Sequence, residues 1–238
     1  MGIFLKAEWR KLVLLNYEVD PAVLQRYIPF GTELDLWDNK CYVSLVAFMF
    51  VNTKVKGVKI PFHINFEEAN LRFYVKHKTA SGEVKRGVVF IKEIVPKPII
   101  TMVANTIYKE HYQTLAMNHN WEEKESLLNV EYCWYVDNVE NSILVETNNQ
   151  QISILSNSEE GFITEHYWGY TKINANKTVE YEVKHPSWQV YKVEKALISV
   201  DFKLTYGNEF EFLNHQQPLS VMLAEGSEIS VGNKQVIS

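Results

Sequence analysis

The tripeptide Glu-His-Tyr occurs twice, at residues 110–112 and 165–167. An acid, an imidazole and a phenol are the side chains that most often transfer protons in enzymes. Phe162, His166 and Tyr170 would share one face of either a helix or a strand, because four- and eight-residue spacings align in both. We interpret this stretch as one wall of a site, with His166 as a candidate acid or base and Tyr170 as a candidate ligand contact. The alternative is that His166 is an ordinary core residue with a single hydrogen bond.

The first copy of the tripeptide follows an apolar segment that begins at Pro98. His111 is a second candidate catalytic residue, and Tyr112 and Tyr108 are candidate contacts to a substrate. The alternative is a loop whose rings only cover the surface.

Residues 66–76 alternate strictly between polar and apolar side chains, as a strand does. The polar face of an open sheet normally meets solvent, whereas in a closed barrel that holds water the polar face can line the interior. Glu68 is then a candidate base, and Arg72 can grip a carboxylate with two hydrogen bonds, with Asn70 beside them. The alternative is a structural ion pair. We expect Lys92 and Glu93, on the next strand, to be buried charges with their own partners.

The sequence lacks the motifs of metal-binding, serine-nucleophile and nucleotide-binding sites. No two of His111, His166 and His185 have the spacing of a helical zinc motif, and the chain has no Cys-x-x-Cys. It also lacks the Gly-x-Ser-x-Gly motif and the glycine-rich phosphate loops. We therefore predict neither a metal nor a cofactor.

The composition narrows the class of protein. The net charge is −5, and no dense run of Lys and Arg appears, which argues against nucleic-acid and membrane partners. Two cysteines do not form a disulfide framework, and charges interrupt the N-terminal apolar run at once. We predict a cytoplasmic protein whose residues 1–238 form one domain.

The remaining patterns predict the secondary structure. Asp20-Pro21 and Pro98 each open a helix, and Ser158 caps a short helix through Tyr167. A hairpin is expected over 33–51 and another over 127–147, and the alternation in 199–207 predicts a strand. The expected fold is α+β, mainly antiparallel β with a few short helices, closed into a barrel or strongly curled.

Longer stretches resemble a known group. These are LNYEVDPAVLQRYIPFGTEL, NFEEANLRFYV, ANTIYKEHY, FITEHYWGYT and LAEGSEISV. They are similar to the YqjF-like uncharacterised bacterial proteins over nearly the whole chain and, more distantly, to acetoacetate decarboxylase. The resemblance implies a cone-shaped antiparallel β-barrel with a central pocket and, commonly, homo-oligomers.

The resemblance also argues against the decarboxylase reaction itself. That chemistry needs a lysine with a lowered pKa that forms an imine with the substrate. Laid on this chain, the reactive-lysine pattern of the family falls on Tyr112 and Gln113, neither of which can form an imine. The prediction is thus a barrel pocket for a small organic ligand, with acid–base chemistry on a carboxylate or carbonyl compound. Two alternatives stay open: a non-catalytic binding or sensing domain, and an interaction module whose barrel is filled by its own aromatic side chains.

Overall fold

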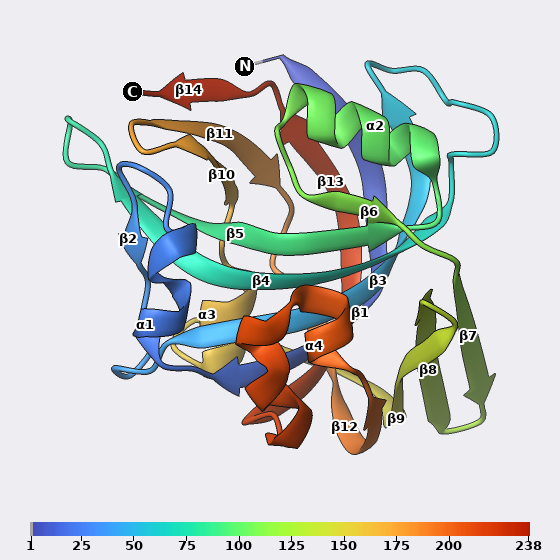
Figure 1. The fold of residues 1–238 in the computed structure, drawn as a ribbon. Helices are drawn as coiled ribbons and strands as arrows, with labels where there is room; N and C mark the ends of the chain where they lie inside the picture. The colour runs from blue at the N-terminus through green and yellow to red at the C-terminus, as the bar shows by residue number, and fades with distance from the viewer. Residues whose placement is uncertain (1) are drawn as a thin grey trace.

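The computed structural model describes residues 2–238, and a single curved β-sheet dominates it (Figure 1). Its strands are β1 Ile3–Glu18, β2 Glu33–Leu34, β3 Tyr42–Val55, β4 Phe66–Lys78, β5 Val84–Val95, β6 Tyr112–Thr114, β7 Met117–Lys124, β8 Leu127–Val136, β9 Val139–Ser153, β10 Trp168–Asn174, β11 Lys177–Lys184, β12 Gln189–Ser199, β13 Ser220–Gly232 and β14 Gln235–Ile237. The helices are α1 Pro21–Leu24, α2 Pro98–Ile107, α3 Glu159–Thr164 and α4 Phe202–Tyr206, with 3-10 turns η1 Gln25–Tyr27 and η2 Asn208–His215. The expected mainly antiparallel β fold with few helices is confirmed.

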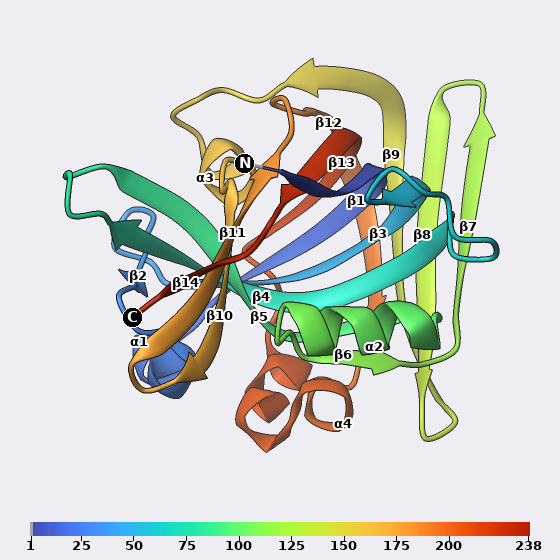
Figure 2. The ribbon, with the colours of Figure 1, turned by 90° about the horizontal axis from the view of Figure 1, so that it is seen from above.

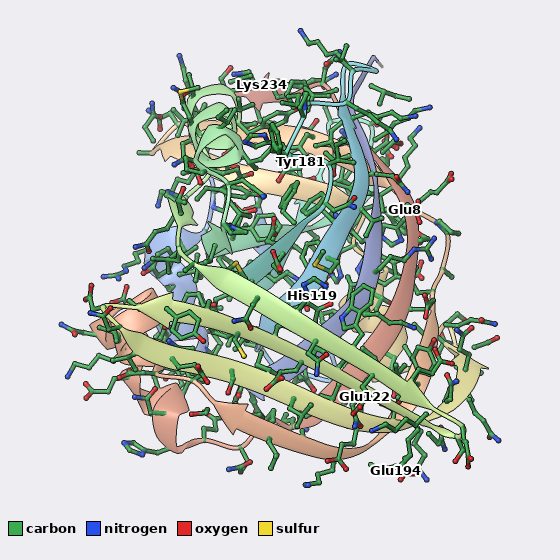
Figure 3. All side chains as sticks on the ribbon, turned by 90° about the vertical axis from the view of Figure 1, so that its right-hand side faces the viewer. Glu8, His119, Glu122, Tyr181, Glu194 and Lys234 are labelled. Atoms are coloured by element: carbon green, nitrogen blue, oxygen red, sulfur yellow. The ribbon has the colours of Figure 1, made fainter. Side chains whose placement is uncertain are left out.

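The strand order explains how this sheet encloses space. Neighbouring strands run β11-β10-β5-β4-β3-β1-β13, and β11 also pairs with β13, so these seven strands form a closed ring. The β10–β5 and β5–β6 pairings are parallel, and the other pairings are antiparallel. Strands β12, β9, β8 and β7 continue the sheet outward from β13 (Figure 2). On the outer strand β7, His119 reaches back to Glu67 of β4 with a 2.7 Å contact (Figure 3).

Strand β4 is buried on both faces, which is why its alternation does not separate core from solvent. Ala69, Leu71 and Phe73 pack in one core cluster with residues of α4 and η2. On the opposite face, Phe66 and Tyr74 pack in a second cluster with residues of α3. The polar residues between them therefore point toward the interior of the ring.

The expected helices begin where their caps predict. The Asp20 carboxylate accepts a 2.8 Å hydrogen bond from the Ala22 N–H, and the Ser158 hydroxyl accepts one of 3.1 Å from Gly161. The helix after Ser158 ends at Thr164 rather than at Tyr167. Helix α2 lies across the top of the ring in Figure 1, beside β6.

Two predicted elements are wrong in part. The turn at Asp38 and Asn39 forms, with φ of 48° and 61°, but the strand before it pairs with β4 rather than with β3. The segment 199–207 is not a strand. Asp201 accepts a 3.0 Å hydrogen bond from the Leu204 N–H and caps α4, which ends at Gly207 with φ of 113°.

Residues 2–238 contain no helix with both the length and the apolar character needed to cross a bilayer.

Candidate functional site

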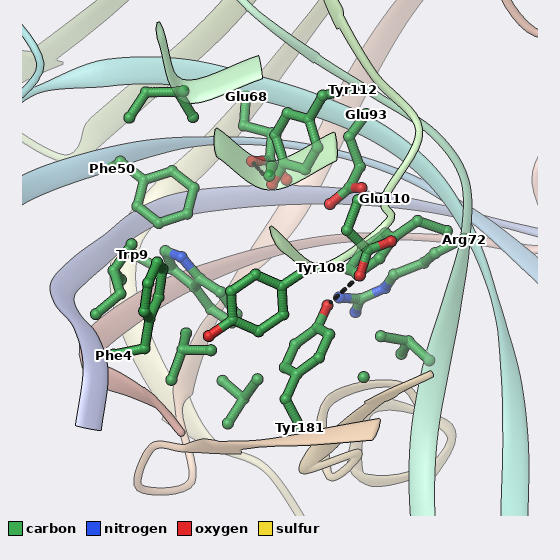
Figure 4. A pocket seen from close by; sticks show the side chains of 18 of the residues that line it. Phe4, Trp9, Phe50, Glu68, Arg72, Glu93, Tyr108, Glu110, Tyr112 and Tyr181 are labelled. Atoms are coloured by element: carbon green, nitrogen blue, oxygen red, sulfur yellow. Dashed lines mark hydrogen bonds between the residues drawn. The ribbon is translucent and has the colours of Figure 1, made fainter. Parts of the chain in front are cut away.

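A cavity of about 130 Å³ lies inside the ring, beneath α2 (Figure 4). Aromatic side chains make up much of its wall, among them Phe4, Trp9, Phe50 and Tyr108. One side of α2 contributes Ile100, Val103 and Ala104, the apolar stripe expected of this helix. The cavity is therefore a largely apolar chamber into which a few polar groups project.

Three glutamates from different parts of the chain line this cavity. Glu68 lies on β4, Glu93 on β5 and Glu110 just before β6, and each is at most 7% exposed. The Glu68 carboxyl accepts hydrogen bonds from Asn70 Nδ2 (2.9 Å) and from the Tyr112 hydroxyl (3.0 Å).

Glu110 and Glu93 are less fully bonded than Glu68. Glu110 Oε1 accepts hydrogen bonds from the hydroxyls of Thr171 (2.7 Å) and Tyr181 (2.8 Å), the latter drawn in Figure 4. Oε2 of Glu93 and Oε2 of Glu110 have no hydrogen-bond partner within residues 2–238.

Burial shifts the titration of all three carboxyls upward. Loss of water raises the pKa of Glu68 to about 7 against the lowering effect of Asn70 and Tyr112, and repulsion from Glu110 adds to the rise. The pKa of Glu110 is raised to about 7, again mainly by burial. The pKa of Glu93 lies well above its usual range, because of burial and then the charges of Glu110 and Glu68. The site can therefore store and release protons near neutral pH.

Arg72 supplies the positive charge of the cavity wall. It is 8% exposed, and its guanidinium makes one weak hydrogen bond, from Nη2 to the Ile163 carbonyl oxygen at 3.5 Å. Its Nε has no partner, and no carboxylate within residues 2–238 forms an ion pair with it. A buried guanidinium normally has its N–H groups satisfied by an acceptor. Arg72 thus has N–H groups that are left without an acceptor within residues 2–238.

His166 lines the cavity as a neutral side chain. Its Nε2 contacts Asp35 Oδ2 at 3.2 Å, and Arg86 Nε donates to the same oxygen at 2.6 Å. Burial lowers the pKa of His166 to about 4, outweighing its hydrogen bond to Asp35. With Nε2 donating its hydrogen bond to Asp35, Nδ1 carries the lone pair, and it has no partner within residues 2–238. His166 is a weak base but a free hydrogen-bond acceptor.

The two Glu-His-Tyr copies contribute to this one cavity in opposite phase. In the first copy Glu110 and Tyr112 line the cavity, whereas His111 is exposed and only its carbonyl oxygen bonds, to the Glu93 N–H at 3.2 Å. In the second copy only the central residue, His166, lines it. Glu110 and Tyr112, two residues apart, both line the cavity, although β6 begins only at Tyr112.

Of the other predicted site residues, Tyr108 lines the cavity, whereas Asn70 and Tyr170 do not. Tyr108 lines the cavity and donates a 3.0 Å hydrogen bond to the Gly232 carbonyl oxygen. Asn70 is buried beside Glu68 and acts on it rather than on the cavity. Tyr170 is fully buried outside the cavity lining, so the structure does not bring it to the site.

Sequence reasoning missed several lining residues. Glu93 was expected to have a partner of its own, but its Oε2 has none within residues 2–238, whereas its neighbour Lys92 donates to the carbonyl oxygen of Thr205. Tyr181 and His185 lie in phase along β11 and its end, a regularity that the alternation of that segment already contains. Glu110 was visible as the acid of the first tripeptide.

Within residues 2–238, neither a lysine on the cavity wall nor a cluster of metal-binding side chains is found. No lysine lines the cavity. In this same range, no group of three or more His, Cys, Asp or Glu side chains is placed to hold a metal ion.

Comparison with known proteins shows the family of this chain. The model of the DUF2071 family, described as "Uncharacterized conserved protein (COG2071)", matches residues 6–228. The chain belongs to this family. The DUF2071 chain is also 30% identical over 83 residues to "Uncharacterized protein YqjF" of Bacillus subtilis (strain 168), an alignment that spans 34% of each protein. This confirms the resemblance found in the sequence.

Solved structures share the fold of the DUF2071 chain at low sequence identity. Acetoacetate decarboxylase from Legionella pneumophila superposes with a TM-score of 0.66 at 10% identity, over 99% of this chain and 87% of that one. An acetoacetate decarboxylase-like enzyme from Sphingomonas wittichii RW1 superposes with a TM-score of 0.67 at 11% identity, over 100% of this chain and 94% of that one. The enduracididine biosynthesis enzyme MppR complexed with pyruvate superposes with a TM-score of 0.67 at 11% identity, over 100% of this chain and 92% of that one. The acetoacetate decarboxylase-like fold is therefore shown.

Proposed function

We propose that the cavity binds a small organic carboxylate and that Glu68 exchanges a proton with it, without an imine. The observation that carries this proposal is Arg72, a buried guanidinium on the cavity wall with no carboxylate partner within residues 2–238. A carboxylate ligand would satisfy its N–H groups with a charge-assisted pair of hydrogen bonds. We also interpret the ring of strands as the cone-shaped barrel that encloses this site.

The size of the cavity supports a small ligand. A dry cavity of roughly 150 Å³ accepts benzene, which has six carbon atoms. A cavity of about 130 Å³ therefore suits a ligand of roughly six non-hydrogen atoms. Three-carbon acids with one further substituent have this size.

Glu68 is the best-supported proton acceptor. Its pKa of about 7 keeps a substantial part of it ionised at neutral pH while leaving it basic enough to remove a proton. The Tyr112 hydroxyl and the Asn70 amide fix the orientation of its carboxyl group. His166, whose pKa is about 4, is a much weaker base and is better suited to accept a hydrogen bond from the ligand.

The likeness to pyruvate-bound MppR and to acetoacetate decarboxylase supports carbonyl acids as the ligand class to test. The imine step of a lysine-dependent decarboxylase has no support here, because no lysine lines the cavity within residues 2–238. Proton transfer next to a carbonyl is the chemistry that the remaining groups allow.

Binding is tested by calorimetry and thermal shift with pyruvate, acetoacetate and propionate. We expect at least one of these acids to bind wild type and the Arg72→Met variant to lose that binding. Arg26→Met, an exposed arginine on η1, is the matched control and should bind as wild type does. If no acid binds folded wild type, the proposal is wrong.

Catalysis is tested by exchange of the pyruvate methyl protons into deuterated water, followed by NMR. Wild type should accelerate the exchange, and Glu68→Gln should abolish the acceleration while the variant still binds pyruvate. Borohydride should trap no adduct on wild type, whereas Tyr112→Lys provides a positive control for trapping. Binding without exchange would instead support a non-catalytic ligand-binding domain.

A further inference from the structure

We propose that the ligand of this cavity is zwitterionic, with a protonated amine that lies against Glu93 and Glu110 while its carboxylate lies against Arg72. This inference rests on the proposed carboxylate site and adds the second charge of the ligand. The chemical class is a small α-amino acid or a similar amino carboxylate.

The unfilled polar atoms of the cavity wall favour such a ligand. Three buried atoms of lining residues have no partner within residues 2–238 and accept hydrogen bonds once the carboxyls are ionised: Glu93 Oε2, Glu110 Oε2 and His166 Nδ1. The matching buried donors are fewer, namely Arg72 Nε and Trp9 Nε1. A buried polar atom without a partner is costly, so the wall is complementary to a ligand with an anionic acceptor and several N–H donors. An ammonium group brings three such donors.

The balance of charges on the cavity wall also favours a zwitterionic ligand. Three carboxyls and a single guanidinium line the cavity. Beyond the effect of burial, Glu110 raises the pKa of Glu68, and both of them raise the pKa of Glu93. A carboxylate bound to Arg72 would add a further negative charge to this group. A protonated amine on the same ligand offsets that charge, and it can replace a proton that a carboxyl otherwise holds.

The aromatic part of the wall suits a cation as well. Tyr181 donates its hydroxyl to Glu110, and its ring packs edge-on against Tyr108 at 5.0 Å. In Figure 4 the Tyr108 ring lies between Trp9 on one side and Tyr181 with Glu110 on the other. Faces of Trp and Tyr rings attract ammonium groups, more strongly where water is excluded. Glu110 thus lies beside an aromatic ring that can also contact an ammonium group, and Arg72 provides the anion-binding group.

A matched series of three-carbon acids separates the ligand classes. Alanine, lactate, pyruvate and propionate share one carboxylate and differ only at the second carbon. We expect calorimetry to give alanine roughly tenfold or greater affinity over propionate, because its ammonium group adds hydrogen bonds to charged acceptors. We also expect alanine binding at pH 7 to release about one proton, seen as a heat that changes with the ionisation enthalpy of the buffer.

Variants distinguish failure of this inference from failure of the proposed function. Glu93→Gln should weaken alanine binding roughly tenfold and leave propionate binding equal or tighter, and Glu110→Gln provides a second variant if the first does not fold. Glu194→Gln, at an exposed site on β12, is the control and should bind alanine as wild type does. If propionate and alanine bind equally and no proton is released, the zwitterion is excluded and the carboxylate site stands. If neither binds, both proposals fail.

Discussion

Replacing Glu110 by Gln should make the protein less sensitive to alkaline pH. Glu110 is buried against the hydroxyls of Thr171 and Tyr181, and a glutamine oxygen can accept the same two hydrogen bonds. The carboxyl that glutamine replaces must ionise inside the protein at high pH, where Glu68 and Glu93 are also becoming charged. The amide cannot ionise, so the variant avoids the free-energy cost of ionising a buried carboxyl at this position.

The magnitude follows from the two pKa values. The pKa of Glu110 is about 7 in the folded protein against a usual value of 4.5, and 1.36 kcal/mol per pKa unit converts the difference to about 3 kcal/mol. The folded protein holds the proton between these values and the unfolded chain does not. This contribution to stability is therefore fully present below pH 4.5 and is lost as the pH rises through 7.

The assay is urea unfolding of wild type and Glu110→Gln at pH 5 and at pH 9. Any constant effect of the amide cancels in the comparison between the two pH values. We expect wild type to lose about 3 kcal/mol more of its unfolding free energy than the variant between pH 5 and pH 9. Glu194→Gln, which Figure 3 shows at the outer surface, should lose as much as wild type. Equal losses for wild type and Glu110→Gln would refute the reasoning.

Two further predictions concern stability and thiol chemistry. Asp201→Ala removes the N-cap of α4 and should lower the unfolding free energy by about 1 kcal/mol, measured by urea unfolding with Glu194→Ala, at an exposed site on β12, as a comparison. Cys41 and Cys133 are buried free thiols, and burial raises the pKa of each to about 11. Ellman's reagent should therefore label neither cysteine in the native protein within minutes and both in denaturant, whereas rapid native labelling would contradict their burial.

Local signals in the sequence were sufficient for much of the fold. Proline after a capping side chain located α1, and proline at 98 located α2 together with its apolar stripe. The alternation in β4 located Glu68 and Arg72 on one face. It did not decide whether that face meets solvent or a cavity, because this depends on the closure of the ring by pairing of β11 with β13. That contact joins residues far apart in the chain.

The error at 199–207 shows how a short alternating segment can be ambiguous. Phe202 and Tyr206 are four residues apart, so they share a face of a strand and also of a helix. In the structure their rings lie 6.0 Å apart on α4. Asp201 as a cap and Gly207 as a terminator were the deciding signals, and they outweigh a two-residue period over so few residues.

Glu93 and Glu110 escaped detection as cavity residues for a related reason. The carboxyl cluster is not a motif, since Glu68, Glu93 and Glu110 come from β4, β5 and the segment before β6. Adjacent strands β4 and β5 place Asn70 opposite Glu93, and β6 pairs in parallel with β5 so that Tyr112 lies opposite Glu93 as well. Register across three strands, rather than spacing along one, thus assembles the acids around one point. A cluster of this kind destabilises the empty fold as its carboxyls ionise, and that penalty is relieved by a ligand with a positive charge. The same side chains that reduce stability at high pH are therefore those expected to select the ligand.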